Sequence, residues 1–113
     1  AALRAGLAEQ GVPVLAFTHL SHLYPQGSNA STTYVFPVAA SYTETEARWR
    51  RLKAAASEAI VRGGGTISHQ HGVGLDHKPY LAAEKGELGL AGMRALYARF
   101  DPAGMLNPGK LVD

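Results

Sequence analysis

The amino-acid sequence predicts an α+β fold, with helices packed on a small antiparallel sheet. Two short segments rich in β-branched and aromatic residues, 14–18 and 32–36, indicate strands. Two longer segments, 44–62 and 87–100, place apolar residues at the spacing of an amphipathic helix. The 113 residues suit one domain, since domains usually run to about 100–150 residues. Two strands do not complete a sheet, so we expect further strands outside this sequence.

The first half of the chain predicts the end of a helix followed by a hairpin. Leu3 and Leu7 lie at helical spacing within residues 2–10, and Gly11 follows as a stop. The two strand segments are separated by a polar stretch, residues 19–31, which contains a Pro-Gln-Gly turn signal. We therefore expect an antiparallel hairpin whose strands are joined by a long loop.

The second half predicts two helices with a glycine-rich segment between them. Residues 43–46 have the spacing of a capping box at the start of the helix over 44–62. A short strand is expected at residues 66–67, where two β-branched residues follow three glycines. The last helix, 87–100, is ended by the Asp-Pro pair at 101–102.

Composition excludes several classes of protein. Without cysteine the chain can form neither a disulfide scaffold nor a thiolate metal site. Its apolar runs fall short of the roughly 20 residues of a membrane helix. A net charge of +2 and a pI of about 9.1 are too mild to indicate nucleic acid as a partner. The chain begins at Ala1 without a methionine or a signal-peptide pattern, so we expect a piece of a longer protein. The expected location of that protein is the cytoplasm.

A first candidate site lies in the glycine-rich segment 63–74. His69 and His71 are two residues apart, so on an extended segment they would point to the same side. Such a pair can act as general acid, general base or charge stabiliser near neutral pH. The alternative is a structural loop in which the histidines bind backbone carbonyls and the glycines provide turns.

A second candidate site follows the first strand. If the strand continues, His22 and Tyr24 share a face and His19 lies on the other. A tyrosine beside a histidine suits proton transfer. The alternative is a half-buried aromatic ring with a hydrated hydroxyl group.

Three other interpretations are not favoured. Neither histidine cluster contains a carboxylate or has a known metal-ligand spacing, so no metal site is predicted. The glycines at 63–65 and 72–74 lack the context of a phosphate-binding loop. The basic residues between Arg48 and Lys53 are expected to form the solvated face of a helix.

Two segments together resemble the FAD-linked oxidases of the vanillyl-alcohol-oxidase type. Residues 64–74 resemble the histidine-rich loop of that family, and residues 100–111 resemble its closing segment. The resemblance implies that residues 1–113 are a C-terminal, substrate-side domain with a ferredoxin-like antiparallel sheet, here truncated. It also implies FAD as cofactor, held mainly by an N-terminal domain that this sequence lacks.

Within that family the sequence is most similar to the alkyldihydroxyacetonephosphate synthases of bacteria and their relatives. Tyr24 begins a match to their Tyr-x-x-Gly turn, and residues 68–72 match their Ser-His-His-His-Gly, with Gln70 in place of the middle histidine. The resemblance implies that Tyr24, His69 and His71 move protons in an acyl-to-alkyl exchange on dihydroxyacetone phosphate. His22 and Gln70 are the expected substrate-binding residues.

The resemblance also gives expectations for cofactor contacts and partners. Gly72 and Gly74 of the loop, and Asn107 and Lys110 of the closing segment, are expected to approach the flavin. The expected partners are a small-molecule or lipid-like substrate and the protein's own FAD-binding domain. A homodimer is a further alternative. A lipid substrate would add membrane association to the cytoplasmic location. The isolated chain is expected to be inactive and to bind FAD weakly or not at all.

Two alternatives to the synthase remain. One is an FAD-dependent dehydrogenase or oxidase of 2-hydroxy acids or alcohols, from the other large branch of the family. Many members of that branch bind a metal, but Gln70 stands where their glutamate would be and Asn29 where the histidine partner of His22 would be. These two replacements are a further argument against a metal site in this chain. The other alternative is a non-enzymatic ligand-binding domain.

Overall fold

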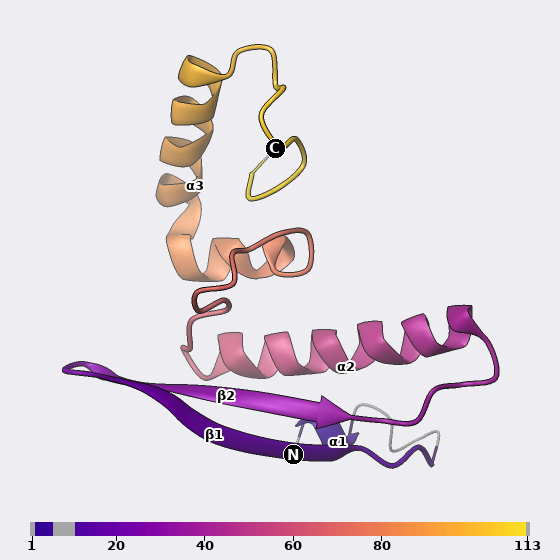
Figure 1. Cartoon of the computed structure of the whole chain (residues 1–113). Coiled ribbons are helices and arrows are strands. Elements are labelled where there is room, and N and C mark those ends of the chain that lie inside the picture. Colours follow the sequence, from indigo (N-terminus) through magenta and orange to yellow (C-terminus); the bar gives the residue numbers. More distant parts are fainter. Residues whose placement is uncertain (1, 6–10, 113) are drawn as a thin grey trace. The chain divides into compact units, whose positions relative to one another are not determined.

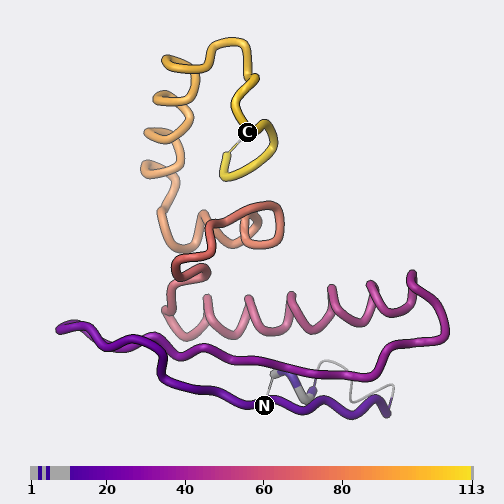
Figure 2. The backbone as a smooth tube through the Cα atoms, in the orientation of Figure 1, coloured from indigo at the N-terminus to yellow at the C-terminus, as the bar shows by residue number. Residues whose placement is uncertain are grey.

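The computed structural model of the chain describes residues 2–5 and 11–112 (Figure 1). Helices and one antiparallel hairpin make up the described residues, which confirms the predicted α+β class. The chain divides into two compact units, residues 1–59 and 60–113, and each is described here by itself. The backbone trace in Figure 2 follows the hairpin of the first unit and the helix and returning C-terminal segment of the second.

The first unit begins with a short helix and a β-hairpin. Helix α1 (Ala2–Ala5) confirms the helix predicted within 2–10 over these four residues, whereas Leu7 lies outside the described residues. Strands β1 (Leu15–Tyr24) and β2 (Gly27–Val35) pair antiparallel.

The polar stretch between the two predicted strand segments is paired strand. The register runs from Leu15 opposite Val35 to Tyr24 opposite Gly27, which leaves residues 25–26 as the turn. The predicted long loop is therefore wrong. Nearly all side chains of β1 are exposed. A strand exposed on both faces can carry polar residues throughout, so its sequence lacks the alternation of a half-buried strand.

A β-bulge decides which side chains share a face near the tip of the hairpin. The pairing register shifts at Ser21, which inserts one extra residue into β1. His19 pairs with Ser31 and His22 with Asn29. Ser31 and Asn29 are two apart on β2, so His19 and His22 lie on the same face. The prediction that His19 lies opposite His22 is wrong, because the bulge removes one step of alternation.

Helix α2 (Tyr42–Arg62) confirms the helix predicted over 44–62. Its capping residue is Ser41, whose hydroxyl accepts a hydrogen bond of 3.2 Å from the backbone N–H of Glu44. The prediction placed the capping residue at position 43, which is two residues too late and therefore wrong. The serine hydroxyl satisfies one of the N–H groups that the first turn leaves without an intrahelical partner.

Burial in the first unit is greatest on α2. Leu52 and Ser57 are 0% and 2% exposed. On the hairpin, Tyr34 is half-buried, whereas Leu15 and Phe17 on the opposite face are 62% and 51% exposed. One face of the hairpin therefore carries exposed apolar side chains.

In the second unit the predicted strand at 66–67 is wrong. Ile67 lies in a bend of the loop that follows α2, although its side chain is only 6% exposed. Its backbone N–H donates to the carboxylate of Glu84 at 2.9 Å, and not to a neighbouring strand. The β-branched side chain of Ile67 indicated a buried position correctly. The position is buried in an anchored loop and not in a strand.

The helix predicted over 87–100 is confirmed as the part of α3 that follows a kink at Gly86, and a further helical turn precedes that kink. The 3₁₀ helix η2 (Lys78–Tyr80), with a proline in its first turn, leads directly into α3 (Leu81–Phe100). Gly86, with φ 67° and ψ 165°, interrupts the helical geometry of α3 and separates a first turn from the predicted segment. Glycine adopts that positive φ without the steric cost that a Cβ would bring.

The core of the second unit is small. It contains Ile67, Leu81 and Leu90, which are 6%, 2% and 7% exposed. Among the described residues, no helix combines the length and the apolar character that crossing a membrane requires.

Candidate functional site

The end of the hairpin holds the first group of predicted site residues. The rings of His22 and Tyr24 are stacked, with centroids 6.3 Å apart and planes within 11° of each other, which confirms that they share a face. The bulged Ser21 contacts His22 through Oγ and Nδ1 at 3.1 Å and accepts a hydrogen bond of 2.7 Å from Asn29 Nδ2. Tyr24 is 48% exposed, so its ring is accessible from solvent.

The histidine loop, residues 63–77, is folded back on itself. The hydroxyl of Ser68 donates to the carbonyl oxygen of Gly72 at 2.5 Å, across the two histidines. Between them, Gln70 has a positive φ of 65°. The assumption of an extended segment is therefore wrong, and the two-residue alternation does not decide the directions of His69 and His71.

The two loop histidines differ in exposure. His69 is half-buried, whereas His71 is exposed. A half-buried imidazole is held in place by its surroundings, and an exposed one can meet a substrate from solvent. The loop thus presents one fixed and one accessible imidazole group.

Glu84, in the first turn of α3, anchors this loop. Its Oε2 accepts the hydrogen bond from the backbone N–H of Ile67, and its Oε1 contacts Lys85 Nζ at 2.7 Å. The Glu84 side chain is 23% exposed. The Lys85 ammonium group and the Ile67 N–H, in that order, lower the pKa of Glu84 below its ordinary value, because both stabilise the carboxylate.

The C-terminal segment, residues 101–112, is anchored to α3 in a similar way. The carboxylate of Asp101 accepts hydrogen bonds from the backbone N–H groups of Met105 and Leu106, at 2.9 and 2.7 Å. Farther along, Lys78 Nζ donates to the carbonyl oxygen of Gly109 at 3.0 Å. These three contacts turn the segment back along the helix.

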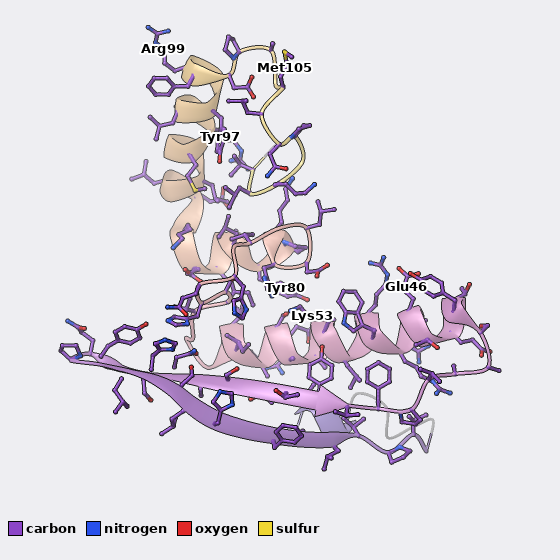
Figure 3. The ribbon with its side chains drawn as sticks, in the orientation of Figure 1. Glu46, Lys53, Tyr80, Tyr97, Arg99 and Met105 are labelled. Carbon is purple, nitrogen blue, oxygen red and sulfur yellow. The ribbon has the colours of Figure 1, made fainter. Side chains whose placement is uncertain are left out.

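A cavity of about 320 Å³ lies between α3 and the returning segment. Asn107 and Lys110, both predicted to contact the cofactor, are among its lining residues. Helix α3 contributes Arg94 and Tyr97 to the same cavity, and its C-cap residue Asp101 lines it too. In Figure 3, Tyr97 lies on the side of α3 that faces the C-terminal segment.

The glycines of the histidine loop and the cavity beside the C-terminal segment are compatible with binding part of a flavin dinucleotide. Gly72 and Gly74 have φ values of 72° and 58°, and the space where their Cβ atoms would stand is open. A cofactor could therefore approach the backbone of the loop closely. Pockets for drug-sized ligands run from about 300 to 1,000 Å³, and a dinucleotide is larger than such ligands. The cavity of about 320 Å³ can therefore enclose only a portion of FAD.

The predicted site residues fall into separate parts of the chain. His22 and Tyr24 belong to the first unit, whereas the histidine loop and the C-terminal segment belong to the second. In the described ranges, 2–5 and 11–112, no three histidine or acidic side chains gather as a metal site would require.

Sequence reasoning missed two residues that hold the second unit together, Glu84 and Asp101. Asp101 was recognised as a helix stop, and a side-chain carboxylate at the end of a helix can bind the N–H groups that follow it. Nothing in the sequence pattern indicated that Glu84 binds a backbone N–H 17 residues earlier.

Comparison with known proteins gives a consistent result. Residues 1–111 match the family described as FAD linked oxidases, C-terminal domain. Alkyldihydroxyacetonephosphate synthase of Dictyostelium discoideum is 30% identical over 106 residues, which cover 92% of this chain and 17% of that protein. The synthase of Caenorhabditis elegans is 32% identical over 106 residues, with 92% and 18% covered.

A second kind of relative matches a shorter stretch. Glycolate oxidase subunit GlcD of Bacillus subtilis is 46% identical over 54 residues, which cover 48% of this chain and 12% of that protein. The chain therefore spans less than a fifth of the length of each of these relatives. No solved structure matches the chain.

Proposed function

The chain belongs to the FAD linked oxidases, as their C-terminal domain, and we propose that it is the substrate-side domain of a flavoenzyme resembling alkyldihydroxyacetonephosphate synthase. The proposed reaction exchanges the acyl chain of an acyl-dihydroxyacetone phosphate for the alkyl chain of a fatty alcohol. FAD, held mainly by an N-terminal domain, would supply the electron-rich ring on which this exchange depends.

The observation that carries the proposal is the anchored histidine loop. Glu84 fixes its start and the contact from Ser68 to Gly72 closes it, so His69 and His71 are held on a defined turn. Relatives that match 92% of the chain are synthases, whereas GlcD of Bacillus subtilis matches 48%.

Each predicted site residue has a part in this proposal. The accessible imidazole of His71 and the hydroxyl of Tyr24 take up and return protons as the acyl group leaves and the alcohol enters. The half-buried His69 holds the loop and stabilises negative charge on the substrate. His22 and Gln70 contact the substrate, His22 from its stacked position beside Tyr24.

The proposal is tested with the full-length protein that carries this chain. Flavin-loaded enzyme is incubated with palmitoyl-dihydroxyacetone phosphate and a long-chain alcohol, and the ether product and the released fatty acid are measured. Equal amounts of both products are expected. A fully flavin-loaded enzyme that yields no ether product would contradict the synthase proposal.

A second candidate function is the oxidation of a 2-hydroxy acid. It is favoured by the 46% identity to GlcD of Bacillus subtilis over 54 residues and by the 39% identity to D-2-hydroxyglutarate dehydrogenase of Stutzerimonas stutzeri over 54 residues. Under anaerobic conditions such an enzyme would bleach its flavin absorbance on addition of D-lactate or D-2-hydroxyglutarate. Unchanged absorbance across a panel of these acids would leave the synthase as the better candidate.

The proposal also includes a cellular location and an oligomeric state. We place the enzyme in the cytoplasm, associated with membranes when its substrate is a lipid. Fractionation of cells with an antibody to the protein tests this location. The mass of the purified enzyme in solution, measured by light scattering, tests whether it is a homodimer.

A further inference from the structure

We propose that the cavity between α3 and the C-terminal segment binds a phosphate group, through Arg94 and Lys110. Both residues line the cavity of about 320 Å³, Arg94 from the helix and Lys110 from the returning segment. The phosphate would belong to the substrate or to the diphosphate of the flavin dinucleotide. This choice of source rests on the proposed function, whereas the binding of phosphate does not.

The helix presents one stripe to this cavity. Tyr97 and Ala98 follow Arg94 by three and four residues, so the three lie on one side of α3, and Asp101, the C-cap of the helix, also lines the cavity. Arg99 lies on the other side of the helix, away from the C-terminal segment (Figure 3). The geometry thus separates a basic residue that lines the cavity from one on the same helix that does not.

The charged side chains that line the cavity are two basic residues, Arg94 and Lys110, and one acidic residue, Asp101. The carboxylate oxygens of Asp101 already accept the N–H groups of Met105 and Leu106, so its negative charge is directed at the backbone. The basic residues therefore outnumber the acidic one, and the lining has a net positive charge.

A third basic residue lies beside the cavity. Lys78 Nζ donates to the carbonyl oxygen of Gly109, which lines the cavity next to Lys110. The cavity and its immediate surroundings therefore carry three cationic groups, those of Arg94, Lys110 and Lys78. Such a cluster repels metal cations and attracts an anion, and a guanidinium group can bind two phosphate oxygens at once.

The remaining lining indicates what is attached to the phosphate. Tyr97, Leu106, Pro108 and Val112 give the cavity apolar walls beside its charged groups. A phosphate ester on a small carbon skeleton, or one phosphate of a dinucleotide beside its sugar, suits both features. A fully apolar ligand would leave the cationic groups without a counter-charge and with a cost of desolvation.

The test uses the full-length protein and four variants: R94Q, R94K, K110Q and the control R99Q. Binding of inorganic phosphate to the apoprotein is measured by calorimetry. R94Q and K110Q should each weaken it by about tenfold or more, the loss expected for a charge-assisted hydrogen bond. R99Q should bind as the wild-type protein does, and R94K should recover part of the affinity.

Two further arms identify the source of the phosphate. If it belongs to the substrate, R94Q weakens binding of dihydroxyacetone phosphate and leaves dihydroxyacetone and FAD unchanged. If it belongs to the cofactor, R94Q weakens binding of FAD and leaves riboflavin unchanged. Failure of the wild-type protein to bind FAD would contradict the proposed function, while the inorganic phosphate arm would still test the cavity.

The inference would be overturned if R94Q and K110Q bound phosphate, dihydroxyacetone phosphate and FAD as tightly as R99Q does. Absence of phosphate binding by the wild-type protein in all three arms would also overturn it. Arg94 is exposed, so its replacement is not expected to prevent folding.

Discussion

The histidine loop and the C-terminal segment are both irregular, yet they are held in different ways. Each is bound to α3 through a carboxylate that accepts backbone N–H groups, Glu84 for the loop and Asp101 for the segment. The loop also buries Ile67, which is 6% exposed, whereas Met105 and Leu106 are 77% and 67% exposed. The loop thus contains a nearly fully buried apolar side chain, whereas the apolar side chains of the segment are exposed or only half-buried. The loop should be the more rigid of the two.

The largest effect is expected from shortening the buried apolar side chain. Ile67→Ala should lower the free energy of unfolding by about 2–4 kcal/mol, because it leaves a cavity beside α3. Leu106→Ala, in the exposed segment, is the matched control and should change it by less than about 0.5 kcal/mol. Urea denaturation measures both. Equal losses would show that the two regions are anchored alike.

The carboxylate of Glu84 should have the next largest effect. Glu84→Ala leaves the N–H of Ile67 without its partner and should cost about 1–3 kcal/mol. Glu84→Gln keeps an oxygen acceptor and should recover part of that loss. Amide hydrogen exchange at Ile67 measures the local opening directly. Exchange as fast in the glutamine variant as in the alanine variant would contradict a hydrogen-bonding role.

Asp101 should matter less to stability and more to the C-terminal segment. Asp101→Ala removes two hydrogen bonds to exposed backbone, with an expected loss of about 1 kcal/mol. Exchange should accelerate at the amides of Met105 and Leu106 and remain unchanged at Ile67. The exposed Asp76 gives the control variant Asp76→Ala. Acceleration at Ile67 as well would mean that the two anchors are coupled.

Acid should loosen the loop through Glu84. Its pKa is lowered in the folded chain, so its stabilising effect is fully present above its ordinary value of 4.5 and is lost as the pH falls through the lower, folded value. Exchange at Ile67, corrected for its intrinsic dependence on pH, should rise below pH 4.5 in the wild-type chain. Glu84→Gln should show no such rise, and a rise of the same size would exclude Glu84 as its source.

Much of the fold follows from the sequence, because the spacing of apolar residues indicates which face of a helix or strand is buried. The helix over 44–62 was predicted to within two residues of α2 at its start and to the residue at Arg62. The hairpin was predicted, but its length was not, since the polar residues of its exposed outer half carry no pattern. The side on which His19 lies depends on the bulge at Ser21, which the sequence does not reveal.

The site was less accessible to prediction than the fold. That His22 and Tyr24 share a face follows from alternation along a continued strand, and the structure confirms it. The turn at Gln70 could not be predicted in this way, because a non-glycine residue with positive φ is uncommon. The anchoring contacts of Glu84 and Lys78 join residues 17 and 31 positions apart, which no local pattern can indicate.

The most direct test of the central claim compares two histidines of the same segment. His71 is exposed within the closed turn over residues 68–72, whereas His77, the last residue of the loop, is half-buried and caps η2. In the flavin-loaded, full-length enzyme, His71→Ala should lower turnover by about 100-fold or more, as the loss of a proton-transferring group does. His77→Ala should lower it by less than about threefold, the effect of a modest structural change. Equal losses in the two variants would contradict the assignment of the loop to the reaction.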